Sequence, residues 1–211
     1  MTQRIIIADD HPLFRTALSH AVGKVWPEAE IVEASSAAQA RAEVEIGAEA
    51  LLLDLHMGDS RGLSALMDFR QDFPALPVAI VSASEDPRVY AAASQLGAAA
   101  FIPKSAPLEQ MRDALACVRD GDGWFPETDA EPDEDLAKIA TLTPAQRRIL
   151  AQLNEGLLNK QIAYELNISE ATVKAHITAI FRKLGVVNRT QAVLLAAKLV
   201  VDQEAAESAS G

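Results

Sequence analysis

Short apolar runs alternate with amphipathic stretches over the first part of the chain. Each run ends in polar or turn-forming residues, which is typical of a buried parallel strand, while the stretches between repeat apolar residues at helical spacing. The predicted strands are residues 4–8, 30–34, 50–53, 78–82 and 98–102, and the predicted helices are 13–25, 37–47, 63–73, 86–96 and 107–118. This alternation predicts an α/β fold, a doubly wound five-stranded parallel sheet (flavodoxin-like) with helices on both faces.

The C-terminal part shows helical periodicity without strands. Each of its helical stretches is preceded by a residue typical of an N-cap, namely Thr143, Asn159, Ser169 and Asn188. The second and third helices are separated only by a short turn around Asn167, which is the spacing of a helix-turn-helix. The sequence therefore predicts a second, smaller, all-α domain of four helices, the last running to about Val201.

Acidic residues and two prolines interrupt the pattern between these parts. We expect an irregular, solvated linker there, because Pro126 and Pro132 break any helix and the segment is rich in Asp and Glu. The expected organisation is an α/β domain at 1–120, a linker at 121–140, a helical domain at 141–201 and a disordered tail at 202–211.

Charge is segregated along the chain, whose net charge is −11. Residues 142–201 hold eight basic and three acidic residues, a net charge of +5, so the remainder carries −16. This asymmetry indicates two domains with different partners, the basic one suited to nucleic acid. The single cysteine, Cys117, fits a reducing compartment. We expect a cytoplasmic protein, since the chain shows neither a signal peptide nor a membrane-spanning apolar run.

Polar side chains follow four of the predicted strands: Asp9, Asp10, Asp54, Ser82 and Lys104. Taken singly, each could be a helix cap or a solvated loop residue. Because the carboxyl ends of parallel strands open at one edge of the sheet, we expect them to converge there. Clustered carboxylates suit Mg²⁺, and an aspartate beside Mg²⁺ can act as a nucleophile and form an aspartyl phosphate. A lysine ammonium and a serine hydroxyl can then hold the phosphoryl oxygens.

Residues 3 to about 120 resemble a response-regulator receiver domain through IIIADDHPLFR, LLLDLHMGDSRG, VAIVSAS and AAFIPKS. The resemblance implies that Asp54 accepts a phosphoryl group from a sensor histidine kinase or phosphotransfer protein. It assigns the Mg²⁺ ligands to Asp9, Asp10, Asp54 and the backbone carbonyl of His56. It assigns phosphate binding to Lys104 and the switch positions to Ser82 and Phe101.

Some positions depart from the family pattern. Gly58 stands where proline is usual and Asp59 where glycine is usual, so we expect a different loop after Asp54 and a different dephosphorylation rate. Phe101 lacks the hydroxyl of the common tyrosine, so its switching would depend on burial. Ser105 replaces a proline that many receivers carry.

Residues from about 140 to 200 resemble the LuxR-type DNA-binding domain through LTPAQRRILAQLNEGLLNKQIAYELNISEATVKAHITAIFRKLGVVNRTQAV. The helical spacing places four residues of the third helix on an outward face that would meet the major groove of double-stranded DNA: Thr172, Lys174, Ala175 and Thr178. The resemblance implies phosphate contacts from Lys160 and Lys183. The apolar fourth helix suggests a homodimer.

The combined interpretation is a phosphorylation-regulated transcription regulator and not an enzyme. An aspartate-based phosphohydrolase is a second possibility, but it requires an acid/base aspartate two residues after the nucleophile, where His56 stands. A third is an interaction protein that has lost DNA binding, which the intact TVKAH segment disfavours.

Overall fold

The computed structural model describes residues 3–199. Its first compact unit, up to Pro132, contains a five-stranded parallel sheet in the order β2-β1-β3-β6-β7. The strands are β1 (Arg4–Ala8), β2 (Glu30–Ala34), β3 (Ala50–Leu53), β6 (Val78–Ser82) and β7 (Ala100–Pro103). The predicted fold class is confirmed, although the last strand starts at Ala100 instead of Ala98. The strand order reverses between β1 and β3, and doubly wound sheets bind ligands beside such a point.

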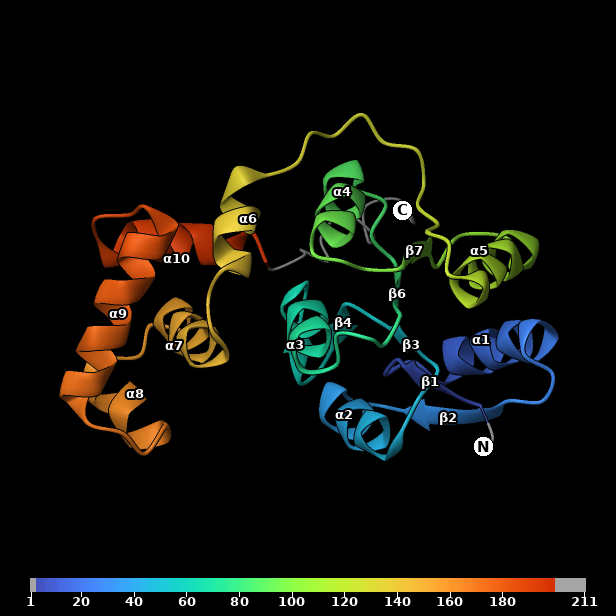
Figure 1. The fold of residues 1–211 in the computed structure, drawn as a ribbon, viewed down its shortest axis with the longest axis horizontal. Helices are drawn as coiled ribbons and strands as arrows, with labels where there is room; N and C mark the ends of the chain where they lie inside the picture. Colours follow the sequence, from blue (N-terminus) through green and yellow to red (C-terminus); the bar gives the residue numbers. More distant parts are fainter. Residues whose placement is uncertain (1–2, 200–211) are drawn as a thin grey trace, which may run out of the picture. The chain divides into compact units, whose positions relative to one another are not determined.

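Helices cover both faces of this sheet (Figure 1). On one face lie α1 (Pro12–Val25) and α5 (Leu108–Asp120), and on the other lie α2 (Ala37–Ile46), α3 (Ser64–Asp72) and α4 (Pro87–Gln95). Ile5 and Ile7 belong to a core cluster with residues of α1 and α5. Ile6 between them is also fully buried. Because alternate residues point to opposite faces, strands covered on both sides must be apolar throughout.

A short antiparallel hairpin forms the loop after Asp54. It pairs β4 (His56–Met57) with β5 (Ser60–Arg61). In its turn, the two carboxylate oxygens of Asp59 accept the backbone N–H groups of Ala37 and Ala38, each at 2.9 Å. The first N–H groups of a helix have no partner within the helix, so Asp59 supplies one and fastens the hairpin to α2.

The first part of the expected linker is built into the sheet. Trp124 forms a parallel bridge with Ala100, and its carbonyl accepts the N–H of Phe101 at 2.9 Å. Its side chain packs against the core cluster under α1 and α5. Further on, the Thr128 hydroxyl donates to the carbonyl of Pro87 at 3.2 Å.

The last part of the expected linker is helical, so the prediction of irregular chain was wrong there. Helix α6 (Glu134–Ala140) starts at Asp133, whose side chain accepts the N–H of Asp135 at 2.8 Å. Leu136 is buried, as is Ile139 one turn later. The boundary between the two compact units lies between Pro132 and Asp133, so α6 belongs to the second unit.

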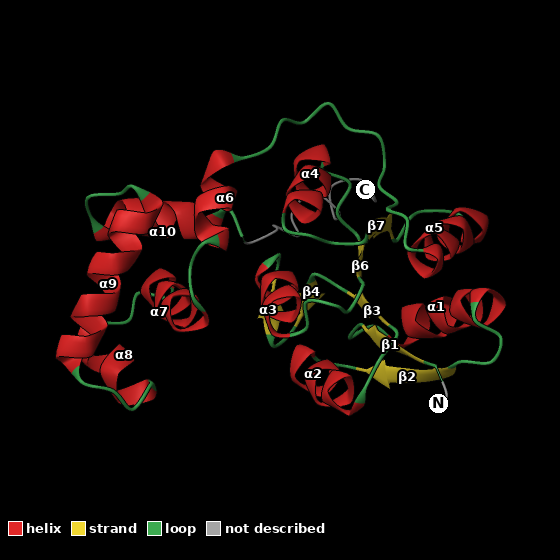
Figure 2. Cartoon of the chain, in the orientation of Figure 1, coloured by secondary structure: helices red, strands yellow, loops and turns green. Residues whose placement is uncertain are grey.

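The remaining helices are α7 (Pro144–Asn154), α8 (Asn159–Glu165), α9 (Glu170–Leu184) and α10 (Arg189–Ala197). Within the described residues this second unit consists of helices joined by turns, without strands, as Figure 2 shows; this was predicted for residues 141 onward but not for α6. Thr143 and Gln146 form a capping box at the start of α7. None of the helices in the described part of the chain is long and apolar enough to cross a membrane.

Two boundaries in this unit differ from the prediction. Asn159 is the first residue of α8 and not its cap, because the Leu158 N–H donates to the side chain of Gln161 at 2.7 Å. Helix α10 ends at Ala197, and the predicted end at Val201 and the tail 202–211 lie outside the described residues. The turn between α8 and α9 contains Asn167 with φ of 52°, a conformation that asparagine tolerates better than most residues.

Candidate functional site

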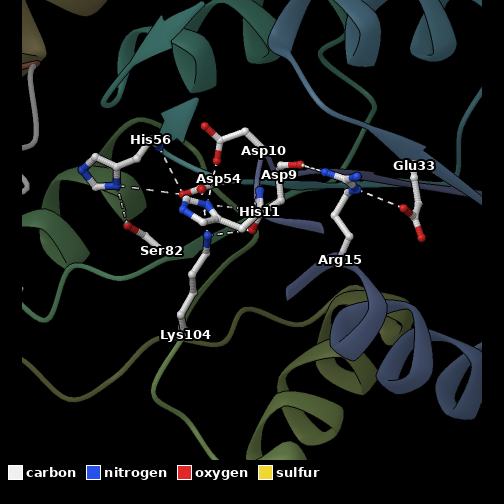
Figure 3. Close-up of polar contacts among 9 residues, drawn as sticks. All are labelled: Asp9, Asp10, His11, Arg15, Glu33, Asp54, His56, Ser82 and Lys104. Carbon is white, nitrogen blue, oxygen red and sulfur yellow. Dashed lines mark hydrogen bonds and ion pairs between the residues drawn. The ribbon is translucent and has the colours of Figure 1, made fainter. Parts of the chain in front are cut away.

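The carboxyl edge of the sheet brings together the residues that the strand pattern singled out. Asp9 and Asp54 directly follow β1 and β3, Ser82 ends β6, and Lys104 follows β7. Their side chains meet in Figure 3, although they are far apart in the sequence. Backbone pairing continues to the pocket itself, since the Asp54 N–H donates to the Ala8 carbonyl at 2.8 Å. The pairing of β1 with β3 therefore fixes the position of Asp54 relative to Asp9.

One ammonium group bridges two buried carboxylates in this pocket. Lys104 Nζ lies 2.8 Å from Asp54 Oδ2 and 2.7 Å from Asp9 Oδ2. Asp9 is 0% exposed and Asp54 is 1% exposed. The ring of Phe14 lies under the ammonium, with its centroid 4.8 Å from Nζ. A buried carboxylate needs such a partner, because transfer of an unpaired charge into a low dielectric is costly.

The electrostatics of Asp54 combine two opposing influences. Burial raises the pKa of Asp54 above its ordinary value, because desolvation disfavours the carboxylate, and the hydrogen bond from Lys104 opposes this. The other oxygen, Oδ1, accepts the backbone N–H of His56 at 3.1 Å. The carboxylate is thus oriented at both oxygens.

The acidic residues of the pocket fit a hard divalent cation. Asp9, Asp10 and Asp54 can each offer an oxygen, and Asp10 lies at the exposed side. Within the part that the structure describes, the buried Oδ2 of Asp9 receives no aligned hydrogen bond, although Lys104 Nζ is 2.7 Å away. Carboxylate oxygens in this number, open to water on one side, are the ligand set of Mg²⁺.

Of the two candidate switch residues, Ser82 lies beside this pocket, next to His56. Ser82 is fully buried, and its hydroxyl accepts the Ser84 N–H at 3.2 Å and lies 3.5 Å from His56 Nδ1. Phe101 in β7 is also fully buried, and its ring packs against Tyr90 of α4 with centroids 4.6 Å apart. The side chain at position 101 therefore makes apolar contacts, which agrees with its lack of a hydroxyl.

Two further side chains at the pocket, both near the start of α1, were not predicted from the sequence. His11 Nδ1 lies 2.7 Å from Asp10 Oδ1. Arg15 donates to the backbone carbonyl of Asp9 at 2.6 Å and pairs with Glu33 at 2.9 Å (Figure 3). The helix that follows a strand with a carboxyl-edge site begins beside that site, and this rule could have identified them.

Helix α9 presents the predicted outward face. Four residues of this helix are exposed, namely Thr172, Lys174, Ala175 and Thr178. On the opposite side, Val173, Ile180 and Leu184 are buried. Lys174 pairs with Glu170 one turn earlier at 3.1 Å. An exposed surface pair of this kind contributes little to stability, so Lys174 can exchange Glu170 for another anion.

The two lysines expected to contact DNA phosphates differ in their surroundings. Lys160 is exposed in the first turn of α8. Lys183 Nζ instead donates to the carbonyl of Thr141 at 2.8 Å and to the side chain of Gln146 at 2.9 Å. These bonds hold the end of α9 against the start of α7, which favours a structural role for Lys183.

Comparison with known proteins agrees with this division into two units. Residues 5–116 match the family model of the response regulator receiver domain, and residues 140–196 match that of the bacterial regulatory proteins of the luxR family. The glycerol metabolism activator of Pseudomonas putida is 38% identical, over 92% of this chain and 94% of that protein. The nitrate/nitrite response regulator protein NarP of Escherichia coli K12 is 32% identical, over 91% and 93%.

A similar solved structure is that of RcsB from Salmonella enterica serovar Typhimurium bound to promoter P1flhDC in the presence of phosphomimetic BeF3⁻. It is 25% identical with a TM-score of 0.54, and the match covers 92% of this chain and 98% of that one.

A receiver-type acidic pocket at a sheet edge, in a chain that also has a helix-turn-helix unit, is the organisation of a response regulator. The chain belongs to the two-component response regulators, with a receiver domain followed by a LuxR-type DNA-binding domain. These are transcription regulators and not enzymes. The pocket of Asp9, Asp10 and Asp54 is of the kind that holds Mg²⁺ in receiver domains.

Proposed function

We propose that Asp54 accepts a phosphoryl group from a phosphohistidine of a sensor kinase or phosphotransfer protein, and that this controls dimerisation and DNA binding by the C-terminal domain. The observation that carries the proposal is the contact of Lys104 Nζ with Asp54 Oδ2 at 2.8 Å, within a pocket that has two further carboxylates. A nucleophilic carboxylate, a cation site and a phosphate-holding ammonium are then together.

The chemistry requires one bond to form and one to break. An oxygen of Asp54 attacks phosphorus, the P–N bond of the donor breaks, and the donor imidazole keeps the electron pair of that bond. The Lys104 ammonium already lies between the two buried carboxylates, so it can bind an oxygen of the phosphoryl group on Asp54. Mg²⁺, held by Asp9, Asp10, Asp54 and the backbone carbonyl of His56, would neutralise the phosphoryl charge.

The conversion of this charge into a signal is assigned to Ser82 and Phe101. The phosphoryl group adds negative charge and strong acceptor oxygens. We expect the Ser82 hydroxyl to leave its contact with the Ser84 N–H and donate to one of these oxygens. The Phe101 ring then repacks against Tyr90, which changes the surface formed by β7 and α4.

We assign DNA binding mainly to α9 and dimerisation to α10. Thr172, Lys174, Ala175 and Thr178 face the major groove, and Lys160 contacts a phosphate. Lys183 can join the phosphate contacts only if it gives up Thr141 and Gln146. Helix α10 carries Leu194, 65% exposed, on the surface where a second copy would pack. The structure of RcsB bound to a promoter in the presence of a phosphomimetic supports the link between phosphorylation and DNA binding.

Intact-mass spectrometry tests the phosphorylation. The full-length protein is incubated with acetyl phosphate and Mg²⁺, and one phosphoryl group per chain should be added. Asp54→Asn should remain unmodified, because its amide is not a nucleophile for phosphoryl transfer. The product should be hydrolysed by mild base, as an acyl phosphate is. An unmodified wild-type protein, or equal modification of Asp54→Asn, would contradict the assignment.

A further inference from the structure

Asp59 joins two segments that lie far apart in the sequence, the hairpin after Asp54 and the start of α2. Its Oδ1 accepts the N–H of Ala37 and its Oδ2 accepts the N–H of Ala38, each at 2.9 Å. Helix α2 has no acidic residue in its own first turn. A carboxylate is favourable at a helix N-terminus, so Asp59 supplies from the hairpin the negative charge that α2 lacks.

This contact holds the tip of the hairpin. The strands β4 and β5 contribute two residues each, and a ribbon of that size is not stable by itself. Met57 is buried and anchors the base of the hairpin. At the tip, Gly58 lacks the positive φ that would require a glycine, and a Cβ added there would meet nothing within 4 Å. Gly58 therefore only adds backbone freedom to the turn, and Asp59 restrains that freedom by binding α2.

The first strand of the hairpin carries His56 into the acidic pocket. The His56 N–H donates to Asp54 Oδ1 at 3.1 Å, and Nδ1 lies 3.9 Å from that oxygen and 3.5 Å from the Ser82 hydroxyl (Figure 3). The His56 side chain is 11% exposed and covers the Oδ1 side of the Asp54 carboxylate, while Lys104 lies at Oδ2. The position of the hairpin therefore decides how well Asp54 is covered.

We propose that Asp59 is a positioning residue of the phosphorylation site: by tying the hairpin to α2, it keeps the His56 imidazole over Asp54 and protects the acyl phosphate from water. The inference rests on the proposed function, since it concerns the lifetime of the phosphoryl group on Asp54. In hydrolysis, the oxygen of a water molecule attacks phosphorus and the P–O bond to Asp54 breaks. The Asp54 carboxylate keeps the electron pair of that bond, and the protons of the water pass to the released phosphate and to solvent. A hairpin released from α2 moves the imidazole aside and admits this water.

The rate at which the phosphoryl group is lost tests this. The full-length protein is loaded with acetyl phosphate and Mg²⁺, freed of the donor, and followed by intact-mass spectrometry at fixed pH. Asp59→Ala should shorten the half-life of the acyl phosphate by about fivefold to tenfold, the change expected when charge-assisted hydrogen bonds no longer hold the hairpin closed. Asp59→Asn keeps one acceptor oxygen, so its half-life should lie between those of Asp59→Ala and wild type.

Ser36→Ala is the matched control. The Ser36 hydroxyl is the own N-cap of α2 and accepts the N–H of Gln39 at 3.1 Å. Its loss weakens the start of the same helix without touching the hairpin, so the half-life should equal that of wild type. Equal half-lives in wild type and Asp59→Ala would overturn the inference. Equal shortening in Ser36→Ala and Asp59→Ala would also overturn it, because a loosened α2 would then be the cause.

NMR of the unphosphorylated protein gives a second readout. The amide and ring signals of His56 should shift in Asp59→Ala and stay as in wild type in Ser36→Ala. Unchanged His56 signals in Asp59→Ala would overturn the inference, because the hairpin would then keep its place without Asp59. A wild type that takes up no phosphoryl group would instead contradict the proposed function, and the NMR comparison would still test the link between Asp59 and His56.

Discussion

At the scale of single residues, Asp54 combines burial with charge. Its carboxylate is 1% exposed, beside the equally buried Asp9, and one lysine serves both. Desolvation raises the pKa of Asp54, which means that folding favours its neutral form. The site that the chemistry requires is therefore destabilising when no cation is bound, a common property of functional pockets.

Asp54→Asn should stabilise the metal-free protein. The folded-state pKa lies above the ordinary value of 3.8, so the ionised group opposes folding at pH values above that folded-state pKa. We expect the free energy of unfolding at neutral pH to rise by about 1 kcal/mol. The gain should shrink as the pH falls below the folded-state pKa, and it should vanish below the ordinary value of 3.8, where both states carry the neutral acid. Urea denaturation in a chelating buffer at several pH values measures this.

The control for this prediction is Asp113→Asn, which alters an exposed carboxyl on α5. It should leave the free energy of unfolding nearly unchanged. A destabilised Asp54→Asn, or a gain independent of pH, would show that burial does not govern the protonation of Asp54.

Substitution of Lys174 should affect DNA binding alone, whereas substitution of Lys183 should affect stability. Lys174→Ala should weaken binding to a duplex selected by the full-length protein from a random-sequence pool by about tenfold, a cost in the range of 1–3 kcal/mol, and leave thermal stability unchanged. Lys183→Ala should lower the stability of the helical unit by about 1–3 kcal/mol, because two polar acceptors lose their charged donor. Fluorescence anisotropy at fixed salt and circular dichroism measure the two effects. The reverse pattern would exchange the two roles.

At the scale of elements, local pattern predicted nearly all of the regular structure. The strands at residues 30–34, 50–53 and 78–82 have the predicted bounds, because each apolar run is short and ends at a turn. The convergence of Asp9, Asp54, Ser82 and Lys104 also follows from the sequence, since parallel strands open at one edge. His11 and Arg15 were not predicted, because hydrophobic periodicity does not encode how α1 leaves β1; only the start of α1 beside the carboxyl edge indicates them.

The segment between the domains could not be predicted from composition alone. Its acids suggested solvated chain, yet Lys198, the residue directly after α10, lies 2.8 Å from Asp133 and 2.7 Å from Asp135. Hydrogen bonds from Lys198 and Lys138 lower the pKa of Asp135, so these acids have partners. The hairpin after Asp54 was missed for a similar reason, because Asp59 finds its partners in α2. Contacts between residues that are distant in the sequence determine the structure of both segments.

Trp124→Ala should destabilise the receiver domain by about 2 kcal/mol, less than for a fully buried aromatic residue. Trp124 is half-buried and packs against the core cluster, whereas a free linker residue would have no effect. The chain has two tryptophans, so the fluorescence of the buried Trp26 alone reports unfolding of the variant. Glu127→Ala, at an exposed site in the same segment, is the control. Equal stability of the two variants would contradict the packing role.

At the scale of the whole molecule, the charges of the two domains match their partners. The pocket gathers carboxylates that suit a cation, while residues 142–201 carry a net charge of +5 that suits the phosphates of DNA. A net charge of −11 therefore says little about either partner by itself. Coupling between the domains requires a two-state element that both sites bias, and the β7–α4 surface beside Asp54 is our candidate.

The most direct test of this account measures DNA affinity as a function of the state of Asp54. Full-length wild type and Asp54→Asn are titrated, at one fixed salt concentration, onto the selected duplex with Mg²⁺, in the presence and absence of beryllofluoride. We expect beryllofluoride to tighten binding by wild type about tenfold, within the usual range of coupling between sites, and to leave Asp54→Asn unaffected. Equal affinity of wild type under both conditions would contradict control of DNA binding by Asp54.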